Sequence, residues 1–98
     1  MRYDLTDRLR FDEDPKLVIR DVELTVRSDA ETVLRLMALL NEKGEAAGAA
    51  EAMALLLDDK DRQALARLGL RMDDWLEVLK TAVQLAMGAD PEDTAPGE

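Results

Sequence analysis

Residues 55–87 read LLLDDKDRQALARLGLRMDDWLEVLKTAVQLAM and predict two helices joined by a short turn. We expect the first helix to span about residues 59–68, because Asp58 or Asp59 offers a carboxylate to the free amides of a first helical turn. Gly69 readily adopts the left-handed conformation that ends many helices. The stretch therefore carries both a start and a stop signal, and the other elements are arranged around it.

The second helix of this stretch begins between Arg71 and Asp73 and runs to about Met87. Asp73 is the chemically better N-cap, because its carboxylate can accept a hydrogen bond from a first-turn amide. If Arg71 is the cap instead, Leu70 and Trp75 stand at the two positions of a hydrophobic staple. The sequence leaves both starts open.

The apolar residues of this second helix form a stripe with spacings of three and four, which is typical of an amphipathic helix. The stripe comprises Trp75, Val78, Leu79, Ala82, Val83 and Ala86. Leu76 and Met87 widen it on one flank, so it is broader than a small domain needs for its own core. The helix is either a central core helix, which is the commoner case, or one that shares its apolar surface with a partner. Trp75 is correspondingly a core anchor, our first interpretation, or an interface hot spot.

Two short strands are predicted ahead of the helices. Residues 16–19 form a β-branched run, and residues 22–26 alternate apolar with polar, which is the period of a half-buried strand. Arg20 and Asp21 lie between them, so an antiparallel hairpin is the economical arrangement. This turn lacks the glycine that tight hairpin turns prefer. An exposed edge of the hairpin is where we expect any self-association.

Two further helices are predicted between the hairpin and residue 58. Ser28 and Glu31 have the spacing of a capping box and should open a helix over about residues 29–43. Gly44 should end that helix. Residues 45–57 are rich in alanine, which favours a helix and permits the close approach of a neighbouring one.

These elements define an α+β fold that is mostly helical, with an N-terminal β-hairpin packed on three or four α-helices. We expect the hairpin and the helices to form one domain over residues 15–88. Residues 1–14 mix charges with a few apolar side chains, and their sequence does not decide between order and disorder. Residues 89–98 hold four acidic and no basic residues, which predicts a disordered acidic tail.

The composition of the 98-residue chain argues against several classes of protein. It contains no cysteine and no histidine, which rules out disulfides, thiolate zinc sites and nucleophiles activated by histidine. A net charge of −9 argues against nucleic acid as a direct partner, since phosphate binding needs a basic face. No apolar run has the length of a signal peptide or a membrane span, so we expect a cytoplasmic protein without a membrane partner.

The densest acidic cluster, Asp58-Asp59-Lys60-Asp61, lacks the pattern of a calcium loop, which needs alternating oxygen ligands, a central glycine and a distal glutamate. Acidic residues favoured by the dipole at a helix start explain this cluster better. The chain also lacks a glycine-rich phosphate loop and the GxSxG motif of a nucleophile elbow. We therefore expect no catalytic, metal or cofactor-binding residues and no enzyme activity.

Taken together, the order of elements from Lys16 to Gly88 and one local signature resemble a known family. The signature consists of LLDDKDR at 56–62, Leu65, LGL at 68–70, DDW at 73–75 and LAMG at 85–88. The pattern resembles the tail assembly chaperones of long-tailed, non-contractile bacteriophages and related prophages. Arg71 departs from the family, which often has a good N-cap such as serine at that position.

The resemblance implies a chaperone that binds the tape measure protein, a long, helical and aggregation-prone chain, while tail tube protein polymerises around it. Tail tube protein is then a second expected partner, in the cytoplasm of the host cell. The family often also makes a longer product by ribosomal frameshifting, and the acidic tail would then be a linker to a second domain. For the partner-binding surface we expect exposed parts of the helical stripes, first of all Trp75, Leu76, Leu79 and Met87.

The main rival to this interpretation is an acidic DNA mimic that inhibits a host nuclease or restriction enzyme. A DNA mimic should spread its carboxylates along one face, whereas the acids here cluster at helix starts and in the tail. A small helical antitoxin or regulator is a further rival. It would normally carry a basic DNA-binding element, and the sequence contains none.

Overall fold

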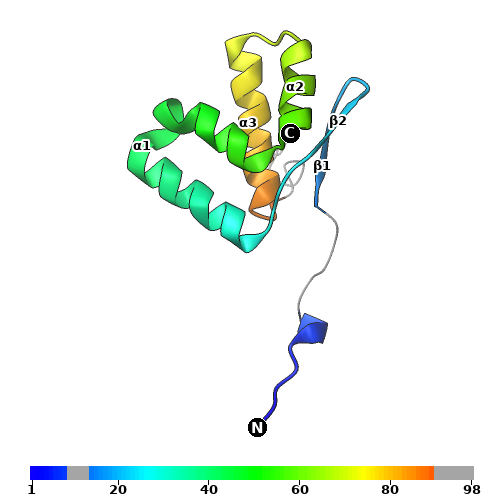
Figure 1. Cartoon of the computed structure of the whole chain (residues 1–98), viewed down its shortest axis with the longest axis vertical. Helices are drawn as coiled ribbons and strands as arrows, with labels where there is room; N and C mark the ends of the chain where they lie inside the picture. Colours follow the sequence, from blue (N-terminus) through cyan, green and yellow to red (C-terminus); the bar gives the residue numbers. More distant parts are fainter. Residues whose placement is uncertain (9–13, 90–98) are drawn as a thin grey trace, which may run out of the picture.

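The computed structural model of this chain describes residues 1–8 and 14–89, in which a hairpin precedes the helices (Figure 1). Its elements are a short 3-10 helix η1 (Thr6–Arg8), strands β1 (Lys16–Ile19) and β2 (Val22–Thr25), and helices α1 (Ala30–Leu56), α2 (Asp59–Arg67) and α3 (Met72–Ala86). This arrangement confirms the predicted α+β, mostly helical fold with an N-terminal hairpin. The predicted acidic tail, apart from Ala89, lies outside the described residues, as do residues 9–13.

The hairpin forms as predicted, with β1 antiparallel to β2 and Ile19 opposite Val22. Its two-residue turn places Arg20 in the left-handed region at φ 57°, which is a conformation that non-glycine residues adopt uncommonly. Beyond the strands, the Val26 amide donates to the Pro15 carbonyl at 2.9 Å and extends the ladder by one pair.

Helix α1 starts at a different cap from the predicted one. The Asp29 carboxylate accepts from the Thr32 amide at 3.1 Å and from the Thr32 hydroxyl at 2.7 Å. These two hydrogen bonds hold the pKa of Asp29 below its ordinary value. The Ser28 hydroxyl donates instead to the Asp14 carboxylate at 2.9 Å. The predicted capping box of Ser28 and Glu31 is therefore wrong, because a stronger acceptor stands one residue later.

Helix α1 is bent sharply at Gly44, whose φ of 81° and ψ of 169° are not helical. The predicted helix end at this glycine is thus confirmed, and the two arms of α1 form a V (Figure 1). A Cβ on Gly48 would lie 3.4 Å from the Leu39 side chain, which is an ordinary contact distance, so the two arms pack against each other at this point. Lys43 and Glu51 form an ion pair across the bend, and this contact raises the pKa of Lys43 above its ordinary value.

The start and stop signals of α2 are confirmed. Asp58 is its N-cap and accepts from the Asp61 amide at 2.9 Å. At its end Gly69 takes a φ of 64°, and its amide donates to the Ala66 carbonyl at 3.1 Å. This last bond is one of the two that define a Schellman ending.

For α3 the structure decides between the two predicted starts. The N-cap is Arg71, which makes no side-chain capping bond, while its carbonyl accepts from the Trp75 amide at 2.9 Å. Leu70 and Trp75 then occupy the positions of the hydrophobic staple, and both are partly buried against the core. The helix ends at Ala86, and Gly88 takes a positive φ of 84° just beyond the C-cap residue Met87.

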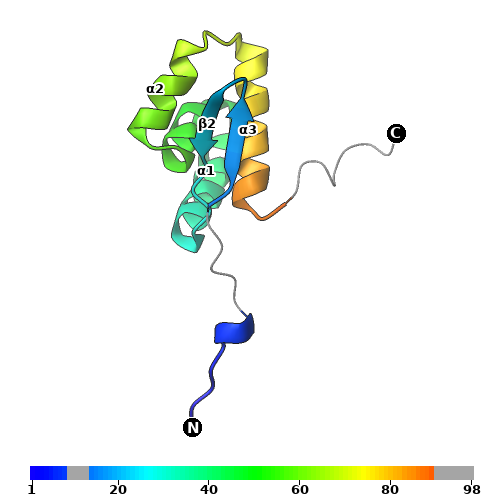
Figure 2. The same cartoon turned by 90° about the vertical axis from the view of Figure 1, so that its right-hand side faces the viewer.

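The core lies where the inner face of the hairpin meets the three helices (Figure 2). Strand β2 lies beside α2, and α1 packs against α3. The largest side chains with almost no exposed surface are Leu24, Leu36, Leu56, Leu57 and Val26. They come from β2, the segment after it, both arms of α1 and the C-cap residue of α1, so burial of their apolar surface joins the hairpin to the helices.

Candidate functional site

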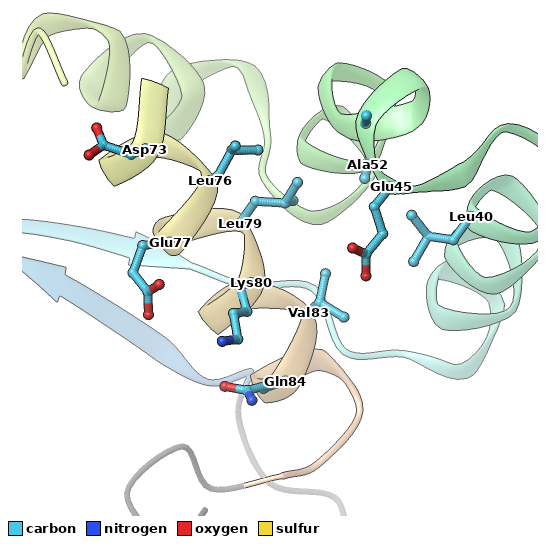
Figure 3. A pocket seen from close by; sticks show the side chains of 11 residues that line it. Leu40, Glu45, Ala52, Asp73, Leu76, Glu77, Leu79, Lys80, Val83 and Gln84 are labelled. Atoms are coloured by element: carbon cyan, nitrogen blue, oxygen red, sulfur yellow. The ribbon is translucent and has the colours of Figure 1, made fainter. Parts of the chain in front are cut away.

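A groove of about 630 Å³ lies inside the V of α1 and is closed on its other side by α3 (Figure 3). Its lining residues come from both arms of α1 and from more than three turns of α3. They are Leu40, Glu45, Ala46, Ala52, Asp73, Leu76, Glu77, Leu79, Lys80, Val83 and Gln84. The bend at Gly44 therefore shapes the groove, because it turns one arm of α1 back toward α3.

The floor of the groove is apolar. Leu76, Leu79 and Val83 project from α3 toward the α1 wall, from which Leu40 projects back (Figure 3). Ala52 on that wall is fully buried and small, so it leaves space in front of the α3 side chains. Leu76 keeps 41% of its surface exposed, whereas Leu79 keeps 7%. Leu79 thus belongs to the floor, and Leu76 is the apolar side chain that a bound molecule could still cover.

Charged side chains border this apolar floor. Asp73, Glu77 and Lys80 lie on the α3 side, and Glu45 extends from the α1 side (Figure 3). The two ion pairs found in residues 1–8 and 14–89 involve other residues, so none of these four charges is neutralised by direct pairing. The border carries three carboxylates and one ammonium group.

The structure distributes the four predicted partner-binding residues over different environments. Leu76 and Leu79 both line the groove. Trp75 is partly buried against the core, and Met87 is 49% exposed at the end of α3; neither lines the groove. The structure thus brings two of the four together at one site.

Sequence reasoning did not find the α1 wall, which consists of Leu40, Glu45, Ala46 and Ala52. The signal for it was present in Gly44 followed by an alanine-rich segment, because a helix breaker before small residues permits two arms to fold back closely. The sequence pattern does not indicate the direction in which the helix bends. This direction places the α1 wall opposite α3.

The groove combines an apolar floor with charged borders. In the described part of the chain no polar or charged side chain is buried, and no group of three or more acidic residues is placed to hold a metal ion. Nor does any helix of that part combine the length and apolar character needed to cross a bilayer. An apolar floor with charged borders can take the apolar side chains of another chain.

Comparison with protein-family models, with curated proteins and with solved structures finds no match to this chain.

Proposed function

We propose that this protein is a non-enzymatic assembly chaperone that holds a helical segment of a long client chain in the groove between α1 and α3. The observation that carries the proposal is the groove itself, in which exposed Leu76 stands beside buried Leu79 with open space opposite. An amphipathic client helix buries its apolar stripe in such a groove, as in other helix-in-groove complexes.

The size of the groove indicates that a client helix would insert only some of its side chains, while its backbone stays outside. The volume of about 630 Å³ lies within the range of roughly 300–1,000 Å³ that holds one drug-sized molecule. An α-helix is about 10 Å across with its side chains, so only its contacting stripe enters a space of this size. The contact would be limited in area and reversible, which suits a protein that must release its client.

The resemblance to tail assembly chaperones indicates which client to expect. Tape measure protein is a long helical chain with apolar stripes that stay uncovered until the tail tube surrounds it. A negatively charged carrier that covers part of such a stripe keeps the chain from aggregating. Tail tube protein is the second partner in this proposal.

The test is a tagged capture of the full chain from its bacterial host during phage or prophage induction, followed by mass spectrometry. We expect a very long helical protein together with a tail tube subunit. Recovery of a nuclease or restriction subunit without tail proteins would overturn the proposal in favour of the DNA mimic.

Photo-crosslinking then locates the client on the surface. A benzoylphenylalanine at Gln84, which lines the groove, should crosslink to the long helical protein. The same probe at Gln63, which is exposed on α2 outside the groove, is the matched control. Equal crosslinking from both positions would contradict binding in the groove.

A further inference from the structure

The charged side chains around the groove are mostly negative, and this excess restricts which molecules can bind there. Asp73 and Glu77 lie on the α3 side of the groove, and Glu45 extends from α1 toward the space between Val83 and Leu40, so carboxylates from both helices stand beside the apolar floor (Figure 3). Lys80 is the single cation among the lining residues. The border therefore keeps a net charge of −2 next to an apolar floor.

We propose that the groove selects helices whose apolar stripe is flanked by lysine or arginine. This inference rests on the proposed function and specifies the chemistry of the client segment. A cation beside the stripe would reach Glu45 on one side or Glu77 on the other while the apolar side chains cover Leu76. Borders of one sign select partners of the opposite sign, because like charges brought together at an interface are strongly unfavourable.

The same charges argue against a second copy of this chain as the occupant. The chain carries a net charge of −9, and the first turns of α3 alone present Asp73, Asp74 and Glu77. A second copy would therefore bring carboxylates to a border that already carries three. The groove thus stays open to a client instead of being filled by self-association.

The experiment compares two synthetic 18-residue amphipathic helices with the same leucine stripe, one flanked by lysines and one by glutamates. Fluorescence anisotropy of the labelled peptides measures their affinity for the full chain. We expect the lysine peptide to bind about tenfold more tightly at low salt, since three exposed ion pairs contribute modestly each. The advantage should shrink as salt is raised, because exposed charges are screened.

Two triple variants test whether the preference for the lysine peptide depends on the carboxylates of the groove. The variant E45Q/D73N/E77Q should lose most of the preference for the lysine peptide. The control E23Q/E31Q/E42Q removes the same number of charges from exposed positions outside the groove. This control should keep the preference for the lysine peptide. Circular dichroism verifies that both variants fold. An equal loss in both variants, or no preference in the wild-type protein, would overturn the inference.

Failure of this inference differs from failure of the proposed function. If the long helical client is captured but the peptides show no charge preference, the charge selection alone is wrong. If the lysine peptide is preferred and only the groove variant loses that preference, the selection holds even when capture returns no tail protein.

Discussion

The junction between β2 and α2 and the junction between α1 and α3 are held together in opposite ways. At the first, the Thr25 amide of β2 donates to the Asp61 carboxylate of α2 at 3.0 Å. At the second, no hydrogen bond joins α1 to α3 within the described residues, and the two helices pack through apolar side chains.

This difference shows why the groove lies where it does. A backbone amide at a strand edge needs a partner at a fixed distance, so the β2 junction must close tightly. Apolar contacts have no such directional requirement, and the small side chains of the second arm of α1 leave the space in front of α3 unfilled. The polar junction thus fixes the relative position of β2 and α2, and the apolar junction leaves an open groove.

The largest expected effect is the difference in folding stability between a variant of a core leucine and a variant of a groove leucine. Leu56→Ala should lower the free energy of unfolding by about 3 kcal/mol, because this fully buried side chain leaves a cavity among close-packed neighbours. Leu76→Ala should cost less than about 1 kcal/mol, because its side chain is 41% exposed. Urea denaturation followed by Trp75 fluorescence measures both. Equal destabilisation would mean that Leu76 belongs to the core and that the groove is closed in solution.

The bend of α1 gives the next largest effect. Gly44→Ala should destabilise the protein by about 2 kcal/mol, because its combination of φ and ψ is essentially restricted to glycine. The Gly48→Ala variant is the control, since this glycine is helical and a Cβ there meets Leu39 at ordinary contact distance. It should be neutral or slightly stabilising by helix propensity. Thermal denaturation of the two variants checks the difference, and equal Tm values would contradict a bend fixed at Gly44.

A smaller effect tests the polar junction. Asp61→Ala should cost about 1–2 kcal/mol, because the Thr25 amide loses its partner in a partly buried place. Asp59→Ala on the same helix removes only an exposed ion pair with Arg62 and should cost less than about 0.5 kcal/mol. Hydrogen exchange of the Thr25 amide provides a local readout. Its exchange should accelerate in the first variant and stay unchanged in the second.

The smallest effect is a dependence on pH at the start of α1. Because the pKa of Asp29 is lowered in the folded protein, its stabilising contribution is present above the unfolded pKa and disappears as the pH falls through the folded one. Asp29→Asn keeps a capping side chain but removes this titration. The difference in Tm between wild type and variant should therefore narrow below the ordinary pKa of 3.8. A difference independent of pH would contradict the capping role of the carboxylate.

The ends of the elements were largely predictable because they depend on local chemistry. Gly44, Gly69 and Gly88 each take a positive φ where the sequence predicts an end, and Asp58 caps α2 as expected. The cap of α1 was predicted wrongly because Ser28 fits a known spacing. Its hydroxyl is engaged by Asp14, a contact across fourteen residues that no local pattern contains.

The candidate site was predictable in part. The wide stripe on α3 includes Leu76 and Leu79, which line the groove, because a stripe broader than a core needs leaves apolar side chains uncovered. Trp75 and Met87 share that stripe in sequence, but they lie outside the groove. The bend at Gly44 decides which part of α3 faces the second arm of α1, and its direction follows from tertiary packing.

The central claim, that a helical client binds in the groove, is tested most directly by capture with two matched serine variants. Leu76→Ser changes the exposed leucine of the groove, and Leu34→Ser changes a leucine that is 64% exposed on the first arm of α1 outside it. Quantitative mass spectrometry of tagged full-length proteins from the induced host measures the long helical client in each sample. We predict that wild type and Leu34→Ser retain the client while Leu76→Ser loses most of it. Equal retention by both variants, or loss from Leu34→Ser alone, would contradict binding in this groove.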